Sequence, residues 1–201
     1  MMQEELIALL AGRRGHFEME SGYHTEWWFN LDALFAHPEQ LRPFVGELAR
    51  RLAVHRIDAV CGPMTGGAKL AQMISAELGV AGFFTERFEQ SGTTAHFPVK
   101  YLIPAARREA VRGKSVAIVD DAVSAGSAAR GTYADLVACG ARPVALGALF
   151  VFGDAAARFA TENGLGLESI VQMSFNLWAP EECPLCRSGV AVEKVSDIAQ
   201  Y

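Results

Sequence analysis

Val-Ala-Ile-Val-Asp-Asp-Ala-Val-Ser-Ala-Gly-Ser, residues 116–127, is the stretch of sequence that decides the predicted fold. Its apolar, β-branched first part ends in two adjacent carboxylates, Asp120 and Asp121, and a loop of small residues with two hydroxyls follows. Residues 128–139 are compatible with a helix, and Gly140 is placed to end it. The stretch therefore predicts a buried strand, a ligand-binding loop and a helix N-terminus in direct succession.

The loop Ser124–Ser127 has the chemistry of an anion-binding site. Its backbone amides and the positive end of the following helix dipole both favour a phosphate group. Asp120 and Asp121 can hold sugar hydroxyls or contribute to the ligand shell of Mg²⁺, although acids placed before a helix can also simply cap its amides. Together, these groups suit a phosphorylated sugar.

Length and composition favour one α/β domain. The chain has 201 residues, which is enough for a full core and too few for two ordinary domains. Its formal net charge of -5 argues against a protein that holds nucleic acid by bulk electrostatics. No apolar run is long enough to cross a bilayer, and acids stand where a secretory signal carries bases. We therefore expect a cytoplasmic protein without a nucleic-acid or membrane partner.

Two β-loop-α-β units predict the architecture of the domain. The first comprises a strand at 57–61, a glycine-rich loop at Gly62–Gly67, a helix at 67–78 and a strand at 80–85. The second begins with the opening stretch and ends with a strand at 143–152. Such units predict a mostly parallel twisted sheet with helices on both faces. Further helices are expected at 38–53 and 154–163.

A small cap is expected ahead of the sheet, in residues 1–36. Residues 4–11 predict a short helix closed by Gly12. A period-2 alternation at 17–19 resumes at 27–29 after a Ser-Gly turn, which predicts an antiparallel ribbon. The aromatic residues of this ribbon either belong to the core or stack on a flat ligand.

A second candidate ligand loop, Cys61–Gly67, follows the strand of the first unit. It offers unencumbered amides that suit a diphosphate, although a plain strand-to-helix turn is the simpler interpretation. In open α/β sheets, ligands bind at the carboxyl ends of the strands, where both loops lie. The loop lacks the Gly-Lys-Ser/Thr order of a Walker A motif, and the chain contains no dinucleotide-binding glycine motif.

Cys183 and Cys186 form a Cys-x-x-Cys pair near the end of the chain. One such pair is half of a structural zinc site, which takes four ligands as a rule. No histidine follows His96 to complete a site nearby in the sequence. The sequence therefore favours a turn with two free thiols, and metal binding stays the alternative.

Several of these motifs resemble one known family. Ile118–Ala128 resembles the 5-phosphoribosyl-1-diphosphate (PRPP) motif of type I phosphoribosyltransferases. Ser21–Phe29 resembles the Ser-Gly-x-x-Ser-x-x-Tyr-Phe ribbon of orotate phosphoribosyltransferases, and Met64–Gly67 resembles their diphosphate loop. The tail at 179–186 is similar to one found in a branch of that family. The resemblance spans nearly the whole chain and is weakest at residues 86–114.

The resemblance implies a type I phosphoribosyltransferase fold and a role for each loop. Asp120 and Asp121 would hold the ribose 2- and 3-hydroxyls, partly through Mg²⁺, and the small-residue loop would cradle the 5-phosphate. The PRPP-binding residues implied are Asp120, Asp121, Ala122, Val123, Ser124, Ala125, Gly126 and Ser127. The diphosphate-binding residues implied are Met64, Thr65, Gly66 and Gly67.

The resemblance also implies a base site, a mobile hood and a homodimer. The base would contact Trp28, Phe29 and Ser124. The polar, basic segment 86–114 would be the hood loop, which brings Arg87 and Lys100 over the leaving diphosphate as catalytic residues beside Asp120 and Asp121.

Two departures from the family pattern concern the base. Glu20 stands where many orotate enzymes have a lysine, and the strand ending at Phe152 lacks the arginine that takes the orotate carboxylate. A buried carboxylate without a cation partner is costly. The acceptor base is therefore expected to be orotate or a different nucleobase.

Three functions remain to be compared. The first is transfer of ribose 5-phosphate from PRPP to a nucleobase with release of diphosphate. The second is a catalytically silent PRPP-binding regulator of the same fold, which the missing base-site cations suggest. The third is a phosphotransfer protein that uses Asp120 or Asp121 as the acceptor, although the small-residue loop fits a phosphate cradle better.

Overall fold

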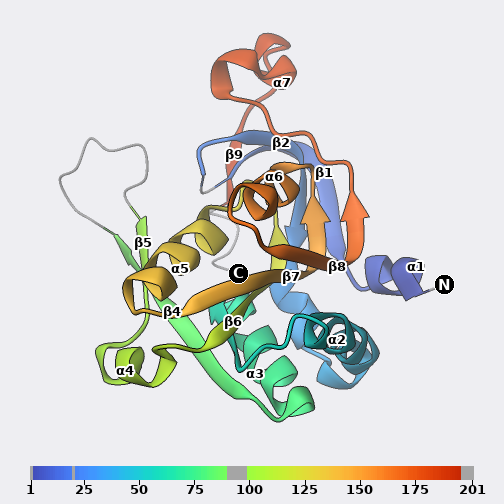
Figure 1. Cartoon of the computed structure of the whole chain (residues 1–201). Helices are drawn as coiled ribbons and strands as arrows, with labels where there is room; N and C mark the ends of the chain where they lie inside the picture. The colour runs from blue at the N-terminus through green and yellow to red at the C-terminus, as the bar shows by residue number, and fades with distance from the viewer. Residues whose placement is uncertain (1, 20, 90–98, 196–201) are drawn as a thin grey trace.

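A six-stranded sheet forms the centre of the molecule (Figure 1). The structure, a computed structural model, describes residues 2–19, 21–89 and 99–195. The strand order is β5-β4-β3-β6-β7-β8, and every neighbouring pair is parallel except the β4–β5 pair. The strands are β3 (Ala59–Pro63), β4 (Ala81–Glu89), β5 (Val99–Leu102), β6 (Ser115–Val123), β7 (Arg142–Phe152) and β8 (Gly166–Met173). The predicted mostly parallel α/β sheet is confirmed.

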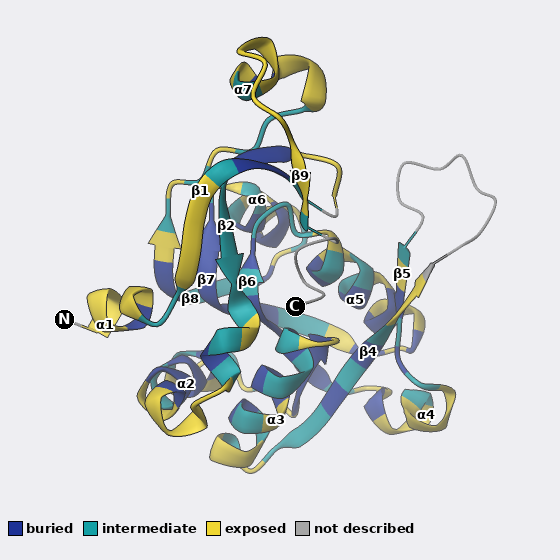
Figure 2. Cartoon of the chain, turned by 180° about the vertical axis from the view of Figure 1, so that it is seen from behind, coloured by how far each residue is buried: buried dark blue, intermediate teal, exposed yellow. Residues whose placement is uncertain are grey.

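Helices cover both faces of this sheet and divide its core into two layers. Along β6, Ala117 and Val119 belong to the layer with α2 and α3, whereas Val116 and Ile118 belong to the layer with α4, α5 and α6. This split follows from the alternation of side chains along a strand, and it explains why a strand buried on both faces is continuously apolar. The helices are α2 (Pro38–Ala53), α3 (Gly66–Leu78), α4 (Arg108–Val111), α5 (Ser127–Ala138) and α6 (Ala155–Glu162). Figure 2 shows the burial of the strands between the helices.

The central strand β6 is longer than the sequence pattern predicts. We expected it to end with the acidic pair, but it continues through Ala122 and Val123, which pair with Phe150 and Val151 of β7. The sheet supplies backbone partners that override the low strand propensity of aspartate. Asp120 and Asp121 therefore lie inside the strand, and the loop begins only after Val123.

The N-terminal helix and ribbon also differ from the prediction in their boundaries. Helix α1 spans Met2–Ala8, and β1 (Ala11–Glu18) already contains Gly12, which we expected to close the helix. A Cβ at Gly12 would lie 2.5 Å from the Phe29 ring of the neighbouring strand, so glycine allows this ring to cross the ribbon. β1 pairs with β2 (His24–Asn30) and with the two-residue β9 (Glu193–Lys194), and the short 3-10 helix η1 (Leu31–Phe35) leads into α2.

The segment 86–114 is not the single loop that we predicted. It contains the end of β4, all of β5, the short η2 (Ala105–Arg107) and α4, while residues 90–98 lie outside the described residues. The buried Asp135 of α5 fixes the exit of this segment, because its carboxylate accepts hydrogen bonds from the Ile103 amide (2.7 Å) and the Arg108 guanidinium (3.0 Å). Arg108 is therefore a structural residue.

The remaining C-terminal elements include β8, which the sequence analysis did not predict, and the short helices η3 (Pro180–Glu182) and α7 (Pro184–Arg187). α7 lies apart from the main sheet, beyond the β1–β2 ribbon (Figure 1).

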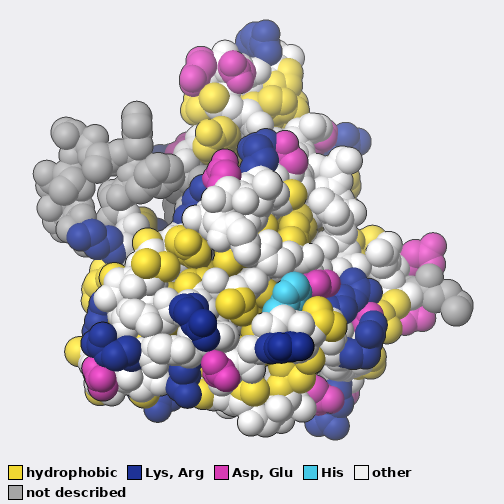
Figure 3. Space-filling model, in the orientation of Figure 1, with side chains coloured by type: hydrophobic (Ala, Val, Ile, Leu, Met, Phe, Trp, Pro, Cys, Tyr) yellow, Lys and Arg dark blue, Asp and Glu magenta, His cyan; other side chains and the backbone are white. Residues whose placement is uncertain are grey.

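On the face seen in Figure 3, acidic and basic side chains are interspersed. Within the described ranges, no helix is long and apolar enough to span a membrane.

Candidate active site

The two candidate ligand loops meet at one edge of the sheet. β3 and β6 are parallel neighbours, so their carboxyl ends, and the loops that follow them, lie side by side. A Cβ at Gly66 would overlap the carboxylate of Asp121, and one at Gly67 would lie 2.8 Å from Oδ1 of Asp120. Glycine at both positions therefore lets the backbone of the first loop contact the acidic pair of the second.

The acidic pair is buried and lacks a cationic partner within the described part of the chain. Asp120 accepts a hydrogen bond from the Asp121 amide (3.1 Å), and Asp121 accepts one from the Ala122 amide (2.8 Å). Burial raises the pKa of Asp120 well above its ordinary value, and the adjacent charge of Asp121 raises it further. Burial also raises the pKa of Asp121. Two buried carboxylates in contact are a donor set that a divalent cation would stabilise.

Three cavities open along this edge of the sheet and share residues of their walls. The first, about 440 Å³, is lined by Thr65, Gly66 and the acidic pair. The second, about 260 Å³, lies between Ser124 and the aromatic residues of β2. The third, about 310 Å³, also contacts Ser124 and extends to Arg130 and Arg158. Trp28 and Phe29 line the first two cavities, so one ligand can reach from the acidic pair to the aromatic wall.

The 260 Å³ cavity has an aromatic wall that a planar ring can stack against. The Phe29 and Phe152 rings stack with centroids 5.4 Å apart, and Phe175 lies 4.8 Å from Phe152. Tyr101 of β5 closes another side. Sequence reasoning missed Phe175 and Tyr101, because one follows the unpredicted β8 and the other lies in a segment that we expected to be a loop. Within the described ranges, no lysine, arginine or histidine lines this cavity.

Ser124–Ser127 forms the turn that joins β6 to α5. Gly126 adopts a left-handed φ of 78° and its carbonyl accepts a hydrogen bond from the Arg130 amide at 2.9 Å. The first turn of α5 thus begins beside the two serines that line the second and third cavities. Arg130 and Arg158, which the sequence analysis did not single out, line the third cavity, where Arg158 forms an ion pair with Asp154 of the same wall.

The structure does not bring the two predicted hood cations to these cavities. Arg87 and Lys100 are exposed on the β4–β5 ribbon, where Arg87 lies opposite Tyr101. Neither side chain lines the three cavities. The rest of the predicted hood at 90–98 and the departure at Glu20 lie outside the described residues.

The fold and this two-loop site define a phosphoribosyltransferase. The phosphoribosyl transferase domain family matches residues 30–158, and the chain belongs to this family. It transfers ribose 5-phosphate from PRPP to a nucleobase, and nothing in the comparisons supports the alternative of a silent regulator.

Curated relatives refine the resemblance. The chain is 29% identical over 183 residues to an orotate phosphoribosyltransferase of Caldanaerobacter subterraneus, covering 90% of this chain and 88% of the relative. It is 28% identical to the orotate phosphoribosyltransferase of Thermotoga maritima, with 96% of both chains covered.

Solved structures show the same fold at lower sequence identity. An orotate phosphoribosyltransferase from Aeropyrum pernix matches with a TM-score of 0.65 and 19% identity, covering 86% of this chain and 94% of that one. An adenine phosphoribosyltransferase from Rhodothermus marinus matches with a TM-score of 0.67 and 16% identity, covering 86% and 98% of the two chains. The fold is therefore shared by structures named for a pyrimidine base and for a purine base.

Proposed function

We propose that this enzyme is of the orotate phosphoribosyltransferase type and that its base stacks in the 260 Å³ aromatic cavity. The observation that carries the proposal is the continuity of this cavity with the acidic pair through Trp28 and Phe29. A base against the Phe29 side of the wall lies next to the Ser124 loop. This arrangement supports a ribose and its 5-phosphate between the acidic pair and the start of α5.

The proposed roles follow the chemistry of each group. Asp120 and Asp121 hold the ribose hydroxyls, and the residues of the Ser124–Ser127 turn hold the 5-phosphate with amides and hydroxyls. Thr65–Gly67 receives the diphosphate, since glycine leaves its amides open to a large anion. Trp28 and Phe29 bind the base. Each group binds or orients PRPP, and none acts as a nucleophile.

Mg²⁺ is the cofactor that we propose. Asp120 and Asp121 fit it, because oxygen donors suit a hard cation and the buried charges of this pair have no cation partner in the described part of the chain. When bound, Mg²⁺ would neutralise charge on the departing diphosphate.

In the proposed reaction, the bond from the anomeric carbon to diphosphate breaks, a bond from that carbon to a base nitrogen forms, and that nitrogen releases its proton to solvent. Diphosphate departs with the bonding electrons, so positive charge develops on the ribose ring. The aromatic wall positions the base for attack and excludes water that would compete with it. Arg87 and Lys100 remain proposed contacts of the leaving diphosphate, reached by movement of the β4–β5 ribbon. A cytoplasmic homodimer is proposed from the family resemblance.

A base without a carboxylate is the second candidate acceptor. The names of the curated relatives favour orotate, but no cation among the described residues lines the aromatic cavity. Desolvating a carboxylate there without a partner costs several kcal/mol. Uracil or a purine avoids this cost and still stacks on the aromatic wall.

The base specificity is tested by measuring diphosphate release from PRPP and Mg²⁺ with orotate, uracil, adenine, guanine and hypoxanthine. We expect turnover with at least one of these bases and a corresponding nucleotide monophosphate by mass spectrometry. A ratio of kcat/KM for orotate over uracil above about 100, equivalent to ~2.7 kcal/mol, identifies orotate as the acceptor. The reverse ratio identifies the neutral base. PRPP binding without turnover of any base would contradict the proposed function.

Gly126→Val tests the phosphate cradle. A β-branched residue at a φ of 78° is strained, and a strain of ~1–3 kcal/mol in this turn is expected to weaken PRPP binding by about 10- to 100-fold. Calorimetric titration with PRPP measures the change. Gly140→Val is the matched control, because Gly140 has a φ of 77° at the other end of α5. The Gly140→Val variant should be less stable than wild type but bind PRPP equally well. If Gly126→Val binds PRPP as tightly as wild type does, the assignment of the phosphate cradle is contradicted.

A further inference from the structure

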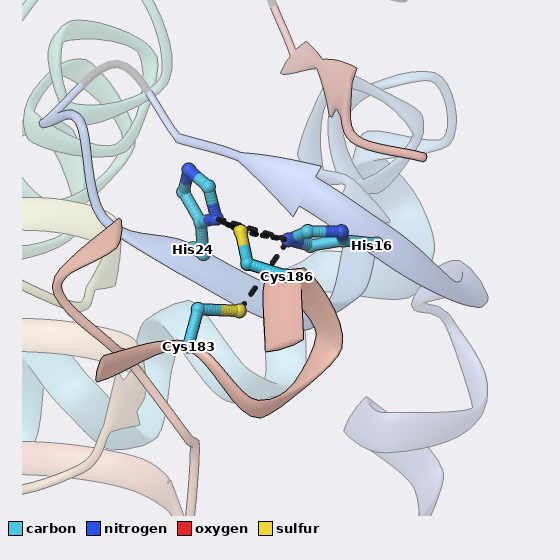
Figure 4. Close-up of side chains that lie close together, drawn as sticks. All are labelled: His16, His24, Cys183 and Cys186. Atoms are coloured by element: carbon cyan, nitrogen blue, oxygen red, sulfur yellow. Dashed lines mark hydrogen bonds between the residues drawn. The ribbon is translucent and has the colours of Figure 1, made fainter. Parts of the chain in front are cut away.

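Two histidines of the N-terminal ribbon and two cysteines of the C-terminal tail converge at one point (Figure 4). His16 belongs to β1, and His24 begins β2. Cys183 directly precedes the short helix α7, and Cys186 lies within it. One ligand atom from each residue lies within 4.8 Å of all the others. The convergence is tertiary, since more than 150 residues separate the histidines from the cysteines.

The spacing of these atoms suits a tetrahedral zinc ion. Zinc bonds of about 2.3 Å to sulfur and about 2.0–2.1 Å to nitrogen place nitrogen and sulfur ligands about 3.6 Å apart. The Sγ atom of Cys183 lies 3.4 Å from Nε2 of His16, and the Sγ atom of Cys186 lies 3.7 Å from Nε2 of His16 and 3.3 Å from Nδ1 of His24. The two histidine nitrogens are 2.9 Å apart and need to separate by only a few tenths of an ångström.

The orientation of His16 leaves its inner nitrogen available to a metal. Nδ1 of His16 lies 2.8 Å from the Val190 carbonyl oxygen. A carbonyl only accepts, so Nδ1 carries the proton and Nε2 presents a lone pair to the cluster. A histidine that ligates a metal through one nitrogen commonly donates from the other to such an oxygen.

We propose that His16, His24, Cys183 and Cys186 form a structural Zn²⁺ site. Thiolate and imidazole ligands favour zinc over magnesium or calcium, which prefer oxygen. Four protein ligands leave no open position for substrate, and two thiolates balance the charge of the ion. Three of the ligands are buried, with exposed fractions of 2% for His16, 6% for His24 and 0% for Cys183, and the exposed Cys186 lies on the solvent side of the site.

The site would fasten the C-terminal tail to the ribbon that borders the substrate cavities. The same segments also meet through the two-residue strand β9, the backbone pairing of His24 with Trp178, and the ion pair between Arg13 and Glu193. A zinc ion would add four bonds to these contacts. Ser21 and Tyr23, in the turn between the two histidines, line the 310 Å³ cavity. None of the four ligands lines that cavity or its neighbours, so the proposal is independent of the function proposed above.

Metal analysis of the purified enzyme, prepared without a histidine tag and under reducing conditions, tests the proposal. We expect about one zinc ion per chain. Cobalt substitution should give the intense visible bands of a tetrahedral site with thiolate ligands. Cys186→Ser is the most informative variant, because Cys186 is exposed and its replacement leaves the buried residues in place. We expect it to weaken zinc binding by at least about 100-fold, since even loss of an outer hydrogen bond to a ligand costs about 10- to 100-fold.

Matched controls separate the site from other thiols and imidazoles. Cys139→Ala removes a free cysteine of α5's C-terminus, and His37→Asn removes an exposed histidine. Both variants should bind zinc as wild type does. If the ligand variants fail to fold, chelation of wild type supplies the second measurement, and it should lower the melting temperature and increase proteolysis of the tail.

Three outcomes would overturn the proposal. The first is wild-type protein that contains no zinc and binds added zinc no more tightly than Cys186→Ser does. The second is protein that was purified under reducing conditions and still contains a Cys183–Cys186 disulfide in place of metal. Mass spectrometry recognises this disulfide because the chain is lighter by two hydrogen atoms. The third is equal loss of zinc in His37→Asn or Cys139→Ala.

Discussion

Replacement of both Asp120 and Asp121 by asparagine is expected to abolish phosphoribosyl transfer without unfolding the protein. The two charges are proposed to hold the ribose hydroxyls and Mg²⁺, and an amide keeps the size of the side chain but loses its charge. We expect kcat/KM to fall by at least about 1000-fold, equivalent to ~4 kcal/mol. Steady-state diphosphate release and calorimetric titration with PRPP and Mg²⁺ measure the loss.

The same double variant is expected to be at least as stable as wild type at neutral pH without Mg²⁺. Burial raises the pKa values of both carboxylates in the folded state. The folded protein therefore holds more protons than the unfolded chain between the ordinary and the raised pKa, and its stability falls as pH rises through that window. The asparagine variant does not lose stability in this way, because it has no carboxylates to ionise at these positions. Its advantage in stability over wild type should therefore grow from pH 4 towards neutrality.

Thermal melting of both proteins across this pH range, with Mg²⁺ removed, checks the expected stability. Glu109→Gln is the charge control, because its side chain is 82% exposed and lines none of the described cavities. It should leave kcat/KM and PRPP binding unchanged. Activity of the double variant within tenfold of wild type would contradict the assignment of the acidic pair.

Gly66→Ala is expected to lower kcat/KM by about 100-fold through a single added methyl group. The new Cβ would overlap the carboxylate of Asp121, so either that side chain or the diphosphate loop must move. Displacement of a positioning group by about 1 Å can cost about 100-fold in rate. Steady-state kinetics should show a raised KM for PRPP as well as a lower kcat, because both ligand loops are disturbed.

Gly46→Ala is the matched control for this substitution. Gly46 lies within α2, and its nearest contact to a new Cβ would be 4.0 Å away, at the carboxylate of Glu77. Alanine at this position should stabilise the protein by ~0.5–1 kcal/mol and leave kcat/KM unchanged. An equal and small effect of both glycine substitutions on kcat/KM would show that the two loops do not depend on this contact.

The sequence predicted the four central strands of the main sheet, β4, β3, β6 and β7, because the information is local. The apolar runs in β3, β6 and β7 and the helical spacing in α2 each specify an element and its buried side. Two strand-loop-helix units then restrict the topology, since parallel strands need crossovers. Because the carboxyl ends of parallel strands lie at one edge of a sheet, the sequence also predicted that the loops at Gly66 and Ser124 lie at the same edge.

The predictions failed where a partner distant in the sequence decides the local structure. β6 continues beyond the acidic pair, through Val123, because β7 supplies hydrogen bonds. Gly12 lies in a strand because the Phe29 ring crosses it. β8 was missed, and with it Phe175, whose ring completes the aromatic wall. Propensity cannot show these partners because they act through tertiary contacts.

By itself, the sequence determined the α/β architecture and the two ligand loops, because strand and helix periodicity, glycines and adjacent carboxylates act over a few residues. Only the tertiary structure decided that Cys183 and Cys186 face two histidines. The sequence search found no histidine near the cysteine pair, since His16 and His24 lie at the opposite end of the chain. The sheet β2-β1-β9 and the backbone pairing of His24 with Trp178 bring the two ends together. The ligands of a metal ion need to be close in space. The spacing of residues along the chain reveals such a site only when the ligands are also close in sequence.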